Sequence, residues 1–96
     1  MLMNKKEAQT ILDGHLAGYA KQTYTKLVTL VEAEHIETFE VRSDSGVCYQ
    51  VEVQFIWDDR PGGAVRILGN IDDGGIRAIF PLGRSELVPP PEAIKP

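Results

Sequence analysis

The chain has 96 residues, of which 43% are hydrophobic and 25% charged, and its formal net charge is −4. This composition is typical of one small globular domain and excludes a chain that is disordered throughout. No apolar run approaches the roughly 18 residues of a membrane-spanning helix, and the opening Met1–Glu7 has no apolar stretch after its lysines. We therefore expect neither a membrane span nor a signal peptide.

The charges are unevenly spread along the sequence. Residues 32–59 contain eight carboxylates and one arginine, whereas the segments on either side are slightly basic. A phosphate backbone would be repelled by this middle segment, so nucleic-acid binding is disfavoured. An acidic surface favours either a basic protein partner or plain solvation. Cys48 is the only cysteine, which excludes an internal disulfide and fits a cytoplasmic protein.

The first third of the sequence has the apolar spacing of a helix. Asn4 with Glu7 three residues later is typical of a helix start. Residues then recur on one face at intervals of three and four: Ala8, Ile11, Leu12, His15, Leu16, Tyr19 and Ala20. Gly14 and Gly18 fall outside this stripe, and we interpret them as candidates for a close packing contact. The stripe continues to residue 34, but β-branched residues weaken helix propensity after residue 22, so we expect a kink or break near 22–25.

The rest of the sequence alternates with the period of strands. The strongest pattern is Val47–Trp57, where the odd-numbered residues are apolar and face the core. Before it, residues 36–42 form a strand with Phe39 and Val41 facing the core, followed by a turn at Ser43–Gly46.

Two more strands are expected after Trp57. Val65–Ile71 and Ile76–Leu82 both alternate, and Asp73-Gly74 between them is typical of a two-residue hairpin turn. Pro81 cannot donate to a strand ladder, so the fourth strand belongs at an edge.

The predicted fold class is α+β. An N-terminal helix, kinked or broken, packs on one face of a four-stranded antiparallel β-meander. Residues 1–88 form this single domain, and residues 89–96, which begin Pro-Pro-Pro, form an extended tail.

The paired aspartates in the turns invite a metal or catalytic interpretation. Asp58-Asp59 and Asp72-Asp73 are separated by a strand, which places them roughly 23 Å apart. The weak candidates for a Ca²⁺ or Mg²⁺ site are Asp44, Asp72 and Asp73, whose turns lie at the same end of a meander. Ordinary turn formation is the favoured role for all of them. We predict no catalytic residue and no cofactor.

The predicted sheet leaves an apolar cluster on the face away from the helix. Ile56, Leu68 and Ile79 fall on that face, with Leu68 opposite Ile79 if the last turn has two residues. Their polar surroundings include Gln54, Arg66 and Arg77. A contiguous exposed apolar cluster with a polar rim is typical of an interface, here a homodimer or the docking of another protein. Cover by the C-terminal tail, or no role, are the alternatives.

The predicted function is therefore a non-catalytic protein-binding or regulatory module. The alternative is a domain that binds a small molecule or divalent cation, or a small hydrolase, with a pocket between helix and sheet. That pocket would be lined by His15, Tyr19, Tyr49 and Trp57.

Two segments also carry a resemblance to known proteins. Trp57-Asp58-Asp59-Arg60-Pro61-Gly62-Gly63, followed by Ile71-Asp72-Asp73-Gly74-Gly75-Ile76-Arg77-Ala78, resembles a set of small bacterial proteins of unknown function. The similarity covers residues 36–82. It implies a bacterial or phage origin and a compact α+β fold, and it supplies no site residue.

Overall fold

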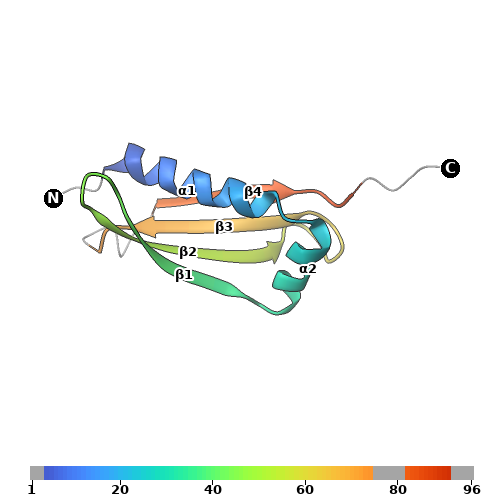
Figure 1. The fold of residues 1–96 in the computed structure, drawn as a ribbon. Coiled ribbons are helices and arrows are strands. Elements are labelled where there is room, and N and C mark those ends of the chain that lie inside the picture. Colours follow the sequence, from blue (N-terminus) through green and yellow to red (C-terminus); the bar gives the residue numbers. More distant parts are fainter. Residues whose placement is uncertain (1–3, 75–81, 92–96) are drawn as a thin grey trace.

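The computed structural model describes residues 4–74 and 82–91, which fold as helices packed on a sheet (Figure 1). The elements are α1 (Lys5–Ala20), α2 (Tyr24–Glu32), β1 (Ile36–Arg42), β2 (Cys48–Trp57), β3 (Val65–Asp72) and β4 (Leu82–Val88). The strands are antiparallel and lie in the order β1-β2-β3-β4, with α1 packed against them. The predicted α+β fold is confirmed.

Both helices begin where a side chain supplies a missing backbone acceptor. Asn4 Oδ1 accepts the Glu7 N–H at 3.1 Å, and Thr23 Oγ1 accepts the Lys26 N–H at 3.1 Å. Such N-caps satisfy donors that the first turn of a helix leaves without an intrahelical partner. The break expected near residues 22–25 is confirmed, because Thr23 caps a second helix there.

The first three strands lie where the alternation of apolar residues predicts them. The predicted turn at Ser43–Gly46 joins β1 to β2, and Gly46 adopts a φ of +87°, a conformation that favours glycine. Val51 of β2 stands between Phe39 of β1 and Ile71 of β3. The odd-numbered residues of these three strands therefore share one face.

The fourth strand differs from the prediction. β4 is Leu82–Val88, whereas the predicted strand was Ile76–Leu82, of which only Leu82 belongs to the described residues. The expected edge position is confirmed, since β4 pairs with β3 at one side of the sheet.

The register of β4 also shows that the predicted hairpin turn is wrong. A two-residue turn at Asp73-Gly74 would pair Ile71 with Ile76, but Ile71 pairs with Leu82. The Asp72 carboxylate accepts the Gly74 N–H at 2.8 Å. A carboxylate that bonds to the backbone two residues later offers the chain a local alternative to the strand ladder.

Contacts with α1 show why residues 82–88 are held as a strand. Arg84 of β4 points toward the helices and donates two hydrogen bonds to the Asp13 carboxylate in α1, at 3.0 and 3.1 Å. Leu82 and Val88 pack against the core on the same face. Arg84 and Glu86 occupy the inward positions between them and interrupt the apolar alternation, so local pattern did not predict this strand.

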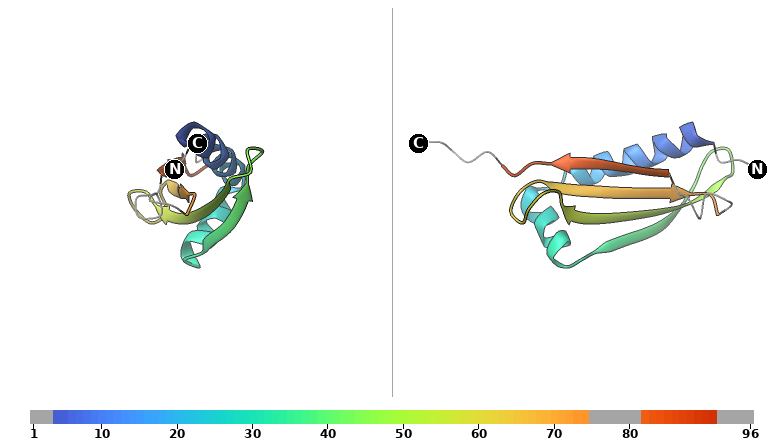
Figure 2. Two further views of the ribbon diagram at one scale, coloured as in Figure 1. Left: turned by 90° about the vertical axis from the view of Figure 1, so that its left-hand side faces the viewer. Right: turned by 180° about the vertical axis from the view of Figure 1, so that it is seen from behind.

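The core lies between the two helices and the odd-numbered face of β2 and β3. α1 lies along β3 and β4, and α2 packs on β2 and β3 near the end of the sheet where β2 finishes (Figures 1 and 2). The buried hydrophobic residues are Ala8, Leu12, Leu16, Leu27, Tyr49, Val51, Val53, Phe55, Val65, Ile67 and Ile71.

Gly69 of β3 allows α1 to approach the sheet closely. A Cβ atom at this position would lie 2.7 Å from Leu12 Cδ1 and 2.9 Å from Leu16 Cδ2. Gly14 and Gly18 do not mark a close contact, since a Cβ atom added to either would have no neighbour within 4 Å. The glycine at the close approach is thus in the sheet and not in the helix.

Candidate functional site

The face of the sheet that points away from both helices is the main candidate site, and we call it the open face. It carries the even-numbered residues of β1, β2 and β3 and the odd-numbered residues of β4, which stand opposite them in register. Its cross-strand rows are Ile56–Arg66–Leu87, then Ile36–Gln54–Leu68–Ser85, Thr38–Glu52–Asn70–Gly83, Glu40–Gln50–Asp72 and Arg42–Cys48.

Four apolar side chains, one from each strand, form a band across the open face. This apolar band consists of Ile36, Ile56, Leu68 and Leu87. Ile36, Ile56 and Leu87 are 53%, 39% and 49% exposed, and Leu68 is half-buried between them. Successive members of the band are diagonal neighbours on adjacent strands, within reach of one another's side chains. The exposed apolar residues therefore form one contiguous strip.

One cross-strand pair of the predicted apolar cluster is wrong. Ile56 and Leu68 lie on the open face as expected, but Leu68 stands opposite Ser85 and not opposite Ile79. Ile79 and Arg77 lie outside the described residues. The register of β4 explains the difference, because it brings residues 82–88 alongside β3.

Sequence reasoning missed Ile36 and Leu87. The phase of the first strand, in which Phe39 and Val41 face the core, already assigns Ile36 to the opposite face. Leu87 had no such indication, because its strand does not alternate clearly.

Within the two rows of the band, the polar residues predicted for the rim are held by neighbours. Arg66 Nη2 lies 2.6 Å from Asp58 Oδ1, and Arg66 Nη1 donates to Ser85 Oγ at 2.6 Å. Gln54 donates to the Glu52 carboxylate at 3.3 Å. Arg66 is therefore already neutralised by an ion pair, whereas Glu52 is bonded to a neutral amide.

The far half of the open face carries three carboxylates and one cation, Arg42. Glu40, Glu52 and Asp72 lie there, and within residues 4–74 and 82–91 none of them forms an ion pair. The Gln50 side chain donates to Glu40, and Asp72 accepts a backbone N–H. These carboxylates remain available to a cation brought by another molecule.

The helical face has a second cluster of polar groups, along the seam between α1 and β1. Glu7, Ile11, His15 and Tyr19 are spaced four residues apart on α1 and so share one side of the helix. The His15 ring lies 4.8 Å from that of Phe39 on β1, centroid to centroid. This stripe of α1 therefore borders the first edge of the sheet.

Two tyrosine–glutamate hydrogen bonds join α1 to the sheet along this seam. The Tyr49 hydroxyl donates to Glu7 Oε1 at 2.7 Å, and the Tyr19 hydroxyl donates to the Glu37 carboxylate. Burial of each hydroxyl, and to a smaller extent its hydrogen bond to a carboxylate, raises the pKa of both tyrosines to about 12. The bond from Tyr49 lowers the pKa of Glu7. Neither hydroxyl is thus prepared to act as a base near neutral pH.

The residues of the predicted helix–sheet pocket do not converge. His15 and Tyr19 border a shallow depression of about 240 Å³ with Gly14, Gly18 and Gln22. Tyr49 is fully buried beside Glu7, near the start of α1. Trp57 is at the other end of β2, roughly 26 Å from Tyr49 at strand spacing. One ligand of ordinary size does not reach all four.

A separate hollow of about 460 Å³ lies where the first half of α1 meets the end of β1. It is lined by Asn4, Lys6, Glu7, Thr10, Ile11, Val41, Arg42, Ser43 and Asp44. Its lining combines the apolar side chains of Ile11 and Val41 with charged side chains of both signs.

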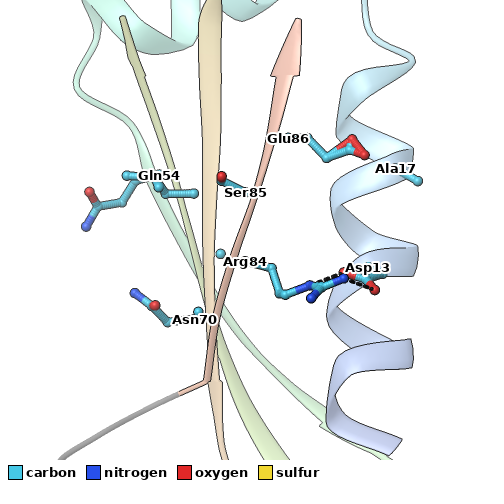
Figure 3. A pocket seen from close by; sticks show the side chains of 10 residues that line it. Asp13, Ala17, Gln54, Asn70, Arg84, Ser85 and Glu86 are labelled. Carbon is cyan, nitrogen blue, oxygen red and sulfur yellow. Dashed lines mark hydrogen bonds and ion pairs between the residues drawn. The ribbon is translucent and has the colours of Figure 1, made fainter. Parts of the chain in front are cut away.

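Another hollow, of about 810 Å³, follows β4, but its lining comes from both sides of the sheet. Figure 3 shows Gln54, Asn70 and Ser85 on one side of the strands, and Asp13 and Ala17 on the helix at the other side. The ribbon of β3 and β4 lies between these two parts of the lining.

The proposed cation ligands are not brought together. Among the residues that the structure describes, no group of three or more His, Cys, Asp or Glu side chains is placed to hold a metal ion. Asp44, Asp72 and Asp73, the weak candidates, therefore do not form such a group.

No family model, curated protein or solved structure matches this chain. The resemblance to small bacterial proteins therefore stays a prediction. In the described part of the chain, neither helix is long and apolar enough to cross a membrane.

Proposed function

We propose that this chain is a non-catalytic protein-binding module that docks a partner through the open face of its sheet. The supporting observation is the apolar band, which contains every large hydrophobic residue found exposed in the described structure. Exposed apolar side chains scattered singly are ordinary on a protein surface, whereas a contiguous strip of them is typical of an interaction site.

The surroundings of the band support the same function. Interfaces commonly combine an apolar centre with a rim of hydrogen-bonding groups. Here Gln54 and Arg66 lie among the apolar residues, and both are already oriented by hydrogen bonds to Glu52, Asp58 and Ser85. A rim that is held in place loses less conformational entropy when a partner binds.

A bait experiment tests this proposal. Three proteins are each immobilised and incubated with extract of the source cells. They are the wild type, the double variant Ile56→Ser with Leu87→Ser, and the control Ala17→Ser on the exposed side of α1. We expect one stoichiometric protein to be retained by wild type and by the control. Calorimetry with that purified protein should show affinity reduced by about ten-fold or more in the double variant. Equal binding by the double variant, or no retained protein, contradicts the proposal.

A homodimer is the other form of this proposal. Sedimentation equilibrium of wild type and Leu68→Glu distinguishes it, because a carboxylate in the centre of the band would be buried without a partner. A wild-type dimer that this substitution dissociates identifies a second copy as the occupant. A wild-type monomer at several hundred micromolar protein, well above typical working concentrations, removes the homodimer.

The second candidate function is small-molecule binding, which the hollow of about 460 Å³ beside Ile11 and Val41 favours. Pockets of roughly 300–1,000 Å³ accept drug-sized ligands. A thermal-shift screen of metabolites checks it, since a ligand at 100 times its Kd adds about 2.7 kcal/mol of stability. A stabilising compound should lose its effect in Val41→Arg, and a screen with no stabilising compound removes this candidate.

A further inference from the structure

We propose that the open face receives an amphipathic α-helix of another protein, whose apolar stripe covers the apolar band and whose basic residues lie over Glu52. This inference rests on the proposed function and names the chemistry of the partner.

The shape of the band fits one helix. Ile36, Ile56, Leu68 and Leu87 follow one another from strand to strand, so the band crosses three strand spacings, about 14 Å. A helix rises about 1.5 Å per residue, so nine or ten residues with apolar side chains on one face cover that length. A helix with one apolar stripe must bury that stripe against another element, and an apolar sheet surface is one such element.

The two flanks of the band differ in charge. On one flank, the neighbouring row holds Glu52, the row beyond holds Glu40 and Asp72, and the last row holds one cation, Arg42. None of the three carboxylates forms an ion pair within the described residues, so this flank is acidic on balance. On the other flank, Asp58 is paired with Arg66. A helix with lysine or arginine on one side of its stripe therefore has a preferred orientation, with that side over Glu52.

A second copy of this chain fits less well. Sheets that pack face to face bury alternating apolar residues along all their strands, but here only two of the five cross-strand rows carry the apolar band. Stacking two copies through the open face would also bring together two sets of the carboxylates that lie on it, those of Glu40, Glu52 and Asp72. Charge thus favours a basic partner over self-association.

The test uses two synthetic helical peptides with the same apolar stripe of leucines at positions i, i+4, i+7 and i+11. One carries four lysines along one flank of the stripe, and the other carries four glutamates at those positions. Binding of each labelled peptide to the full chain is measured by fluorescence anisotropy. We expect the lysine peptide to bind about ten-fold or more tightly than the glutamate peptide, and to weaken as salt is raised.

Matched variants locate the binding. Glu52→Lys should weaken the lysine peptide by about ten-fold. Glu32→Lys, at an exposed position in α2, makes the same change in net charge and should alter the affinity by less than about two-fold, since it lies on the helical layer. Circular dichroism and urea midpoints confirm that each variant is folded.

The outcomes separate this inference from the proposed function. If both peptides bind equally and the Ile56→Ser, Leu87→Ser variant loses both, the open face docks helices but the basic partner is overturned. If neither peptide binds, or if Glu32→Lys weakens binding as much as Glu52→Lys, the helix is overturned. A wild-type dimer sensitive to Leu68→Glu overturns it in favour of a second copy, while docking through the open face survives.

Discussion

At the scale of single residues, the position of α1 depends on a glycine of the sheet, Gly69. Gly69 lies directly under Leu12 and Leu16, and its missing Cβ leaves the space that these leucines occupy. Protein interiors are packed closely enough that even one added methyl group forces a shift. Gly14, in contrast, faces open space on the outer side of α1.

This contrast predicts opposite effects of the same substitution. Gly69→Ala should lower the free energy of unfolding by about 1–3 kcal/mol, because two leucine side chains must move. Gly14→Ala should raise it by up to about 1 kcal/mol, because alanine is the better helix former and meets no neighbour. Urea denaturation of the two variants checks both, and a Gly69→Ala variant as stable as wild type would show that α1 is not held so closely.

At the scale of elements, α1 is attached to the sheet by different means along its length. Near its start, Glu7 accepts hydrogen bonds from Tyr49 and Ser45 of the sheet and its turn. Near its end, Tyr19 donates to Glu37 of β1. Both tyrosines must keep their protons for these bonds to exist, so the attachment is sensitive to alkaline pH.

The pH dependence follows from the raised tyrosine pKa. The pKa of Tyr19 and of Tyr49 is about 12 in the folded chain, against 10.0 for an ordinary tyrosine. Between these values the folded state binds more protons than the unfolded state, so stability is fully present below pH 10 and falls as pH rises toward 12.

Urea unfolding from pH 8 to 11.5 checks this expectation. The wild type should lose stability over that range more steeply than the double variant Tyr19→Phe with Tyr49→Phe, which lacks both groups. Tyr24→Phe, which keeps both tyrosine–glutamate pairs, is the matched control and should follow the wild type. Parallel curves for all three proteins would contradict the role given to these hydroxyls.

At the scale of the whole molecule, the helices cover one face of the sheet, and no described helix or strand packs on the other. Neighbouring residues in β3 therefore lie in opposite environments. Ile67 is fully buried under the helices, whereas Leu68 is in the apolar band.

Adjacent truncations in β3 test this two-layer arrangement. Ile67→Ala should lower the free energy of unfolding by about 2–5 kcal/mol, because it leaves a cavity in the core. Leu68→Ala should cost about 1 kcal/mol or less in the free chain, because the side chain it removes is partly in water. Similar losses from both substitutions, measured by urea denaturation, would mean that the open face is also covered.

The outcome of the sequence predictions can be followed through particular elements. β2 was predicted because its odd-numbered residues are apolar and lie on the face that meets the core, so local pattern and tertiary burial agree. The same alternation predicts that Ile56 and Leu68 lie on the open face. β4 was not predicted, because its stabilising contacts are with Asp13 of α1 and with β3, both distant in sequence.

The sequence by itself determined the helix with its break at Thr23, the first three strands, and the face of each that meets the core. Hydrophobic periodicity and capping are local properties, and they act on neighbouring residues. Only the tertiary structure decided that Leu82–Val88 is the fourth strand and that Leu87 completes the apolar band. Those features depend on strand register and on helix placement, which are set by contacts between residues far apart in the chain.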